Sequence, residues 1–171
     1  MRKVMYSVAM SLDGYIARPD GSYDWIPDEP TIDWAEFMGR FDTMLVGRKT
    51  WEVAPGPGEQ PMRTYLFSST MRQEDHPGVT LVSQDAADFV ARLRQESGKD
   101  IWLMGGGELF RSLFRAGLVD GVETAVTPVL LGRGLPMLPN VNHSARLALR
   151  QTRTYPSGIV LLTYDVIRDT V

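Results

Sequence analysis

The sequence predicts an α/β fold: a central mixed, mostly parallel sheet with helices on both faces and an antiparallel hairpin at its C-terminal end. Patterns typical of buried strands alternate with helical patterns along most of the chain. Two apolar segments at the end then flank a Tyr-Pro-Ser-Gly turn at residues 155–158. The length of 171 residues, with 43% hydrophobic and 23% charged residues, is ordinary for one globular domain. We therefore expect residues 1–171 to form a single domain.

The first half of the chain predicts two strands, each followed by a helix. Residues 4–10 are apolar or small at nearly every position, as in a strand covered on both faces, and a Ser-Leu-Asp-Gly turn follows. A helix is expected to begin near Thr31, because apolar residues recur at helical spacing over positions 34–41. Residues 43–46 predict the second strand, with Thr50 as a candidate N-cap of the next helix.

The second half predicts further strands and two longer helices. Strands are expected at residues 64–67, 79–82, 101–104 and 122–126, and the closing hairpin at residues 147–154 and 159–167. Apolar spacing predicts one helix over residues 86–93, with Gly98 as its C-terminal glycine, and another from residue 107 that ends at Gly117.

Composition excludes several classes of function. The chain has no cysteine and only two histidines, so we expect no thiolate nucleophile, no metal centre and no hydrolase triad. A net charge of −3 and a pI near 5.4 argue against a nucleic-acid surface. The apolar runs are far shorter than the roughly 18 residues that a membrane helix needs. We expect a cytoplasmic protein that binds neither nucleic acid nor membrane.

Two glycine-rich loops have the design of an anion-binding site. Gly47, Arg48, Lys49 and Thr50 follow one predicted strand, Gly105, Gly106 and Gly107 follow another, and each group opens a helix. Free backbone N–H groups and the positive end of a helix would then face the carboxyl edge of the sheet, where open α/β sheets bind ligands. The plainer alternative is that these glycines only make tight turns. Neither loop matches the GxGxxG or the GxxxxGK pattern, so a different nucleotide-binding arrangement is expected.

A few polar and aromatic residues are further candidates. Ser68 and Ser69 end a predicted strand and would add hydroxyl groups to the same edge. Asp33 lies at the margin of an apolar stripe, where partial burial would raise its pKa, although an Asp in this place is also typical of a helix N-terminus. Trp25 and Trp34 are candidates for a substrate wall or for the core.

Several segments, in order, resemble one family. VGRKTWE at residues 46–52, FSS at residues 67–69 and MGGGELF at residues 104–110 resemble the cofactor loops of dihydrofolate reductase. AMSLDGYIA at residues 9–17 and the segment 104–138 are very similar to the reductase domain of the bifunctional deaminase-reductase of riboflavin biosynthesis. The chain is identified as a member of the dihydrofolate reductase-like family, including this riboflavin branch.

The resemblance implies an NADPH-dependent reductase with a dihydrofolate reductase-like three-layer fold. Asp33 would be the catalytic acid, Thr127 its hydrogen-bond partner and Phe37 a contact of the substrate ring, and Trp25 is the remaining substrate candidate. A hydride would pass to the carbon of a C=N bond while Asp33 helps to protonate the nitrogen. Arg48 and Ser69 would bind the 2′-phosphate of the cofactor. The full set of implied cofactor residues is Ala9, Ile16 and Ala17 at the nicotinamide, Gly47, Arg48, Lys49, Thr50, Ser68 and Ser69 on the adenosine side, and Met104, Gly105, Gly106, Gly107, Glu108, Leu109 and Phe110 at the pyrophosphate.

The chain departs from both relatives at substrate positions. Met62 stands where dihydrofolate reductase has the arginine that grips folate, and residues 37–43 lack the serine-arginine cluster of the riboflavin branch. The zinc site of the deaminase half needs cysteines, which this chain does not have. We therefore expect a stand-alone, homodimeric reductase of a pyrimidine- or pterin-like compound, closest to 5-amino-6-(5-phosphoribosylamino)uracil reductase. The alternatives are dihydrofolate reductase itself and a nucleotide-binding module without catalysis.

Overall fold

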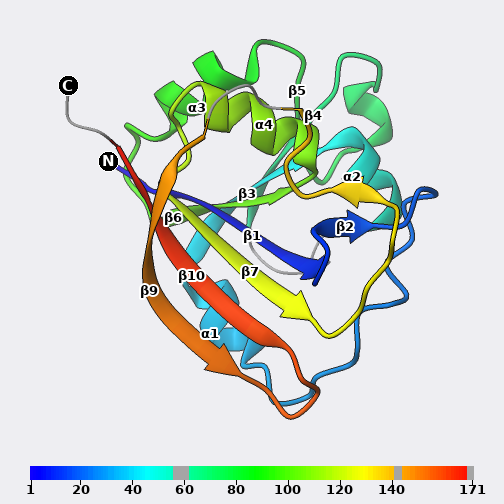
Figure 1. Ribbon diagram of the computed structural model, residues 1–171. Helices are drawn as coiled ribbons and strands as arrows, with labels where there is room; N and C mark the ends of the chain where they lie inside the picture. Colours follow the sequence, from blue (N-terminus) through cyan, green and yellow to red (C-terminus); the bar gives the residue numbers. More distant parts are fainter. Residues whose placement is uncertain (56–61, 141–143, 169–171) are drawn as a thin grey trace.

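The computed structural model describes residues 1–55, 62–140 and 144–168, and its centre is one eight-stranded sheet. The strand order is β5-β4-β3-β6-β1-β7-β10-β9, parallel from β5 to β7 and antiparallel at β10 and β9. This confirms the predicted mixed sheet with a closing hairpin (Figure 1). The strands are β1 (Val4–Ser11), β3 (Phe41–Gly47), β4 (Arg63–Phe67), β5 (Thr80–Val82), β6 (Asp100–Gly105), β7 (Gly121–Thr127), β9 (Arg146–Thr154) and β10 (Val160–Ile167).

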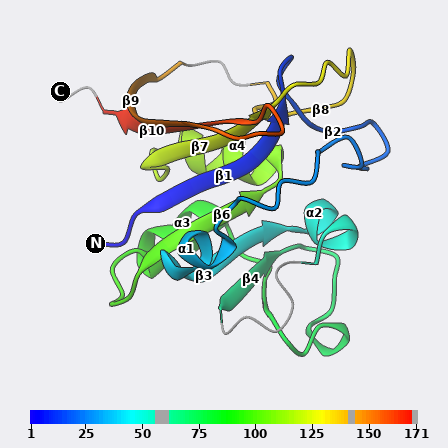
Figure 2. The same cartoon turned by 90° about the horizontal axis from the view of Figure 1, so that it is seen from below.

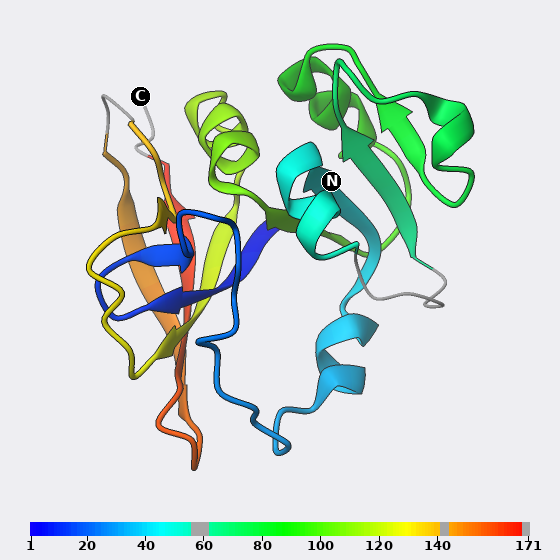
Figure 3. The same cartoon turned by 90° about the vertical axis from the view of Figure 1, so that its right-hand side faces the viewer.

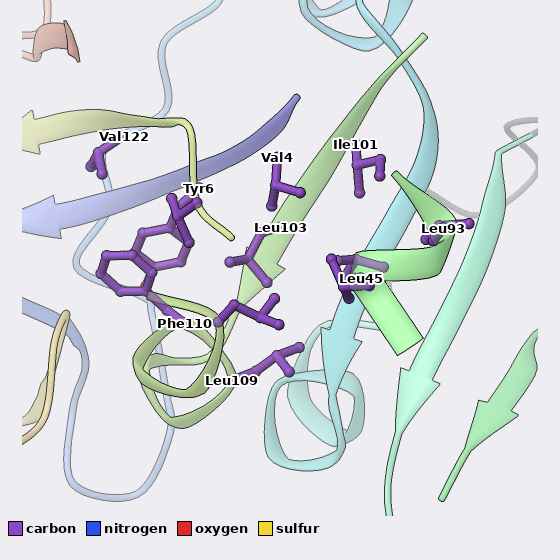
Figure 4. Close-up of a cluster of buried hydrophobic side chains, with 12 residues drawn as sticks. Val4, Tyr6, Leu45, Leu93, Ile101, Leu103, Leu109, Phe110 and Val122 are labelled. Atoms are coloured by element: carbon purple, nitrogen blue, oxygen red, sulfur yellow. The ribbon is translucent and has the colours of Figure 1, made fainter. Parts of the chain in front are cut away.

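Helices cover both faces of the sheet, as predicted. Figure 1 shows α3 (Ala86–Leu93) and α4 (Gly107–Arg115) on one face and α1 (Trp34–Gly39) on the other, while α2 (Arg48–Val53) follows β3 directly. A single turn of 3-10 helix spans Gln73–Asp75. The main core lies under α3 and α4, where the ring of Tyr6 stacks on Phe110 with centroids 3.9 Å apart (Figure 4). A second core, under α1 and α2, is built around Phe41, Met44 and Trp102.

The predicted helix ends need three corrections. The first helix begins at Trp34 with Asp33 as its N-cap, not near Thr31. The N-cap of α2 is Gly47 and not Thr50, because the chain leaves β3 extended through Gly47 and becomes helical at the next residue. Gly98 lies beyond the C-cap of α3, and only its φ of +148° and the close approach of Asp42 require a glycine there.

The predicted end of α4 is confirmed, whereas one short strand pair was not predicted. Gly117, with φ +67°, ends α4 as predicted, and the N–H of Leu118 bonds back to the carbonyl of Leu113. The antiparallel pair of β2 (Tyr15–Ala17) and β8 (Leu135–Pro136) was not predicted, because segments of three and two residues carry no alternating pattern. Of the loop over residues 54–62, residues 56–61 lie outside the described residues.

Candidate active site

The two glycine loops meet at the carboxyl edge of the sheet. β3 and β6 are parallel neighbours, and Val46 is in register with Gly105, so the turns that follow them lie side by side. A Cβ on Gly47 would lie 3.5 Å from the Gly105 carbonyl oxygen, and one on Gly106 would lie 2.9 Å from the Thr50 hydroxyl and 4.0 Å from Ile16. The two loops therefore approach each other so closely that a side chain at Gly106 would collide with Thr50. These glycines do more than make turns within their own loops.

The first backbone N–H groups of α4 have no side-chain cap. Its N-cap, Gly106, has no side chain, so these N–H groups keep the capacity to bind an anion. The loop over residues 136–139 packs against Gly107, where a Cβ would lie 2.8 Å from the Pro136 carbonyl. Glu108 points outward to Arg111. Leu109 and Phe110 have their side chains in the main core, so at this site they can contribute only backbone groups.

A cavity of about 390 Å³ is lined by Arg48 of the first glycine loop and by residues that end or follow β4 and β5. Of the predicted cofactor residues it contains Arg48, Ser68 and Ser69, but not Lys49, which is exposed. The Ser68 hydroxyl accepts from the backbone N–H groups of Thr70 and Met71, which fixes the turn after β4. The full lining is Arg48, Phe67, Ser68, Ser69, Thr70, Val82, Ser83, Gln84 and Ala86. We call this cavity the serine pocket.

Sequence reasoning missed Thr70, Ser83 and Gln84 in this pocket. Ser83 and Gln84 follow β5, and β5 is the parallel neighbour of β4, so their place depends on which strands are adjacent. The polar residues at the end of each predicted strand were the available signal, but the strand order was not.

The nicotinamide side of the predicted site is formed by β1, β7 and β2. Ala9 pairs with Ala125, and Ala17 lies in the short strand β2 that pairs with β8. The turn between β1 and β2 is held by Asp13, whose carboxylate accepts hydrogen bonds from the Ser11 hydroxyl and from the N–H groups of Leu131 and Gly132. The Ser11 hydroxyl and these N–H groups hold the pKa of Asp13 below its usual value.

The predicted partnership of Asp33 and Thr127 is not formed. Thr127 is fully buried, and its hydroxyl donates to the Met10 carbonyl at 3.2 Å. The Asp33 carboxylate instead accepts from the Glu36 N–H at 2.8 Å, which is the N-cap bond of α1. The expected partial burial of Asp33 is also wrong: it is exposed, because α1 is short and its first residue, Trp34, has 57% of its surface exposed.

The two aromatic substrate candidates, Phe37 and Trp25, are both largely covered by other parts of the chain. Phe37 is partly buried, with its ring edge-on to Trp102 at 5.2 Å between centroids. Trp25 is 7% exposed, and its indole N–H has no hydrogen-bond partner among the described residues. The segment that carries Trp25 runs from β2 to α1 (Figure 3). It is fastened by Glu29, which accepts from the N–H of Ser157 in the hairpin turn.

An ion pair that the sequence did not predict holds α1 to the sheet. Arg40, the C-cap of α1, donates from both terminal nitrogens to Glu123 of β7 at 2.9 and 2.8 Å. Thr163 of β10 donates to the same carboxylate, and the guanidinium of Arg40 lies about 5 Å from the ring centroids of Phe37 and Phe41. A charged residue inside the apolar strand of residues 122–126 was the available signal for this contact.

A second cavity, of about 350 Å³, lies beyond this ion pair toward the amino end of β1 (Figure 2 shows α1 and β10 on either side of β1). Two of its three cations are already paired, Arg40 with Glu123 and Arg150 with Asp165. The cavity therefore offers little net charge to a ligand. It is lined by Lys3, Met5, Arg40, Phe41, Asp100, Arg150, Gln151 and Thr163.

Two further searches give negative results for the part of the chain that the structure describes. In residues 1–55, 62–140 and 144–168, no three acidic or histidine side chains cluster as metal ligands would. Over the same residues, no helix has both the length and the apolar character to cross a membrane.

Comparison with known proteins assigns this arrangement to a family. The family model of the RibD C-terminal domain matches residues 2–161. The chain belongs to the RibD C-terminal domain family. YwjB of Bacillus subtilis is 32% identical, and the match covers 94% of this chain and 96% of YwjB. YyaP of the same organism is 31% identical, and the match covers 95% of this chain and 94% of YyaP. The riboflavin biosynthesis protein RibD of Corynebacterium ammoniagenes is 24% identical over 79% of this chain, and the match spans 45% of that protein.

Solved structures agree with this family. A putative riboflavin biosynthesis protein from Shewanella sp. PV-4 is 25% identical, with a TM-score of 0.83 and coverage of 97% of this chain and 99% of that one. Dihydrofolate reductase from Enterococcus faecalis, complexed with NADP(H), has a TM-score of 0.73 at 17% identity, with 96% of each chain covered. This RibD C-terminal domain protein therefore has the dihydrofolate reductase-like fold, and its family implies oxidoreductase activity, consistent with a pyrimidine reductase-like role.

Proposed function

We propose that this chain is an NADPH-dependent reductase that reduces a C=N bond of a pyrimidine- or pterin-like compound. The observation that carries the proposal is the close approach of the two glycine loops, the first of which contributes Arg48 to the serine pocket. A phosphorylated dinucleotide needs backbone N–H groups that its pyrophosphate can approach closely, and a polar pocket for its 2′-phosphate. Both features lie at the carboxyl end of the same sheet.

The residues of the site fit such a cofactor. A Cβ on Gly106 would collide with the Thr50 hydroxyl at 2.9 Å, so only backbone stands at this point, and the first N–H groups of α4, which no side chain caps, would bind the pyrophosphate. Arg48 would bind the 2′-phosphate by charge-assisted hydrogen bonds, together with the Ser69 hydroxyl. When bound, NADPH supplies the hydride that adds to the carbon of the C=N bond, while a proton adds to the nitrogen and NADP⁺ remains.

The chain itself would handle the proton and the orientation of the substrate. In this proposal Asp33 passes a proton from solvent to the nitrogen, since its carboxylate is exposed at the start of α1. Phe37 provides an aromatic contact for the ring. Trp25, which is 7% exposed, is the second substrate candidate. Thr127, which bonds to Met10, would fix the end of β1 and not the acid itself.

The test has a binding stage and a turnover stage. A thermal-shift titration with NADPH, NADH and NADP⁺ should raise the melting temperature, since a ligand at 100 times its dissociation constant stabilises a protein by roughly 2.7 kcal/mol. Oxidation of NADPH, followed by absorbance, should then appear with 5-amino-6-(5-phosphoribosylamino)uracil or a related heterocycle. Oxidation with dihydrofolate alone would instead favour dihydrofolate reductase. Binding without oxidation across the panel would favour a nucleotide-binding module, and the absence of any shift would refute the reductase.

The proposal includes a cytoplasmic homodimer. The long edge strand β9 is exposed at all nine residues, and it carries Leu147 and Leu149 on one face. This pair of exposed leucines is the apolar surface that a second copy would cover.

A further inference from the structure

Arg48 already has a partner in the structure. It is the first residue of α2 and lines the serine pocket, but its Nη1 donates a 2.8 Å hydrogen bond to Oε1 of Glu52, one helical turn later. Both side chains are partly exposed, and Glu52 does not line the pocket. A phosphate that enters the serine pocket therefore meets a guanidinium that a carboxylate already holds.

Arg48 matters because the other polar groups of the pocket are neutral. Among the described residues that line it, the hydroxyl groups of Ser68, Ser69, Thr70 and Ser83 and the amide of Gln84 accompany a single charge, that of Arg48. The neighbouring Asp85 uses its carboxylate to cap α3, accepting from the Asp88 N–H. The affinity of the pocket for a 2′-phosphate therefore depends on whether the Arg48 guanidinium can leave Glu52 and bind the phosphate.

We infer that Glu52 sets the cofactor preference of this chain: as a counter-ion of Arg48 it competes with the 2′-phosphate, so that the chain discriminates only weakly between NADPH and NADH. This inference rests on the proposed function, because it concerns the same pocket. Binding of the phosphate requires Arg48 to leave or share Glu52, and it brings a phosphate close to a carboxylate of like charge. NADH lacks this phosphate and leaves the pair undisturbed.

The test measures dissociation constants of NADPH and NADH for the wild type and for Glu52→Gln. An exposed ion pair is weak, so the variant should bind NADPH roughly three- to fivefold more tightly, while the constant for NADH stays within about twofold. The gain should shrink at high salt, where exposed charges are screened. Glu96→Gln is the matched control, since it breaks the exposed pair with Arg63 at the start of β4, the strand end opposite the pocket, and should change neither constant.

A double-mutant cycle then tests whether Glu52 acts through Arg48. In an Arg48→Gln background, which should remove the weak preference for NADPH that the wild type has, Glu52→Gln should tighten NADPH binding clearly less than it does in the wild type. If NADPH binds the wild type but Glu52→Gln leaves its constant unchanged, or tightens NADH by the same factor, the role of Glu52 is refuted while the proposed function stands. If neither nucleotide binds the wild type, the proposed function and this inference fail together.

Discussion

Asp33 combines two roles that a substitution can separate. It is the N-cap of α1 and also the proposed proton donor. Asn caps a helix about as well as Asp, so Asp33→Asn should leave the melting temperature nearly unchanged. It removes the acid, and kcat with the heterocycle that proves to be the substrate should fall at least about 100-fold. Asp33→Ala should show the same loss of turnover and a further destabilisation of about 1 kcal/mol. Full turnover by Asp33→Asn would remove the residue from the mechanism.

Glu29 gives a second prediction for a single residue, concerning pH. The Ser157 and Thr31 side chains and the Ser157 N–H lower the pKa of Glu29 from 4.5 to about 2. A carboxylate whose pKa is depressed in the folded state stabilises that state above its unfolded pKa, and the contribution is lost as the pH falls from about 4.5 toward 2. The melting temperature should therefore fall more steeply between pH 5 and 3 in the wild type than in Glu29→Gln. Parallel pH curves for the two proteins would contradict this assignment.

Among the elements, α1 depends most on one contact. The Glu123 side chain is 3% exposed, and Arg40, 41% exposed, is its only cationic partner among the described residues. Removing one partner of a buried ion pair leaves an uncompensated charge, so Arg40→Met should lower the free energy of unfolding by about 3 kcal/mol, the lower end for buried pairs because Arg40 is partly exposed. Urea denaturation measures this change.

The double variant Arg40→Met with Glu123→Gln provides the control for this element. It removes the orphaned charge, and much of the lost stability should return. Arg153→Gln, which breaks the exposed 3.9 Å contact with Glu36 on α1 and the stacking of Arg153 on Tyr155, should have little effect. If Arg40→Met proved as mild as Arg153→Gln, the ion pair would not be what fastens α1.

The positions of the secondary-structure elements could be predicted from the sequence better than the contacts between them. Strand positions could be predicted because apolar runs and turn residues are local signals, and the two glycine loops could be predicted for the same reason. The contact of Gly106 with Thr50 could not, because it depends on β3 and β6 being neighbours in a particular register. The exposure of Asp33 likewise depends on the length of α1, which has only six residues and ends at Gly39, two residues before β3 begins at Phe41. The contacts between segments could not be predicted because they depend on non-local strand pairing, whereas the errors at the helix ends were local.

For the whole molecule, the hairpin leaves an apolar surface that a second copy would cover. Leu149 is in register with Tyr164, and Leu147 with Val166, which packs against the main core, so both leucines lie on the face of the sheet that carries α4. Leu149 has 57% of its surface exposed. Sedimentation at micromolar concentration should therefore give a species of twice 19.1 kDa.

Leu149→Glu should convert this species to a 19.1 kDa monomer, because a charge on the covered face would be desolvated without a partner. Leu130→Glu is the matched control: Leu130 is even more exposed but lies in the loop after β7, so the dimer should persist. Unchanged far-UV circular dichroism would show that both variants are folded. A wild-type monomer, or a dimer that withstands Leu149→Glu, would mean that this face of β9 and β10 is not the interface.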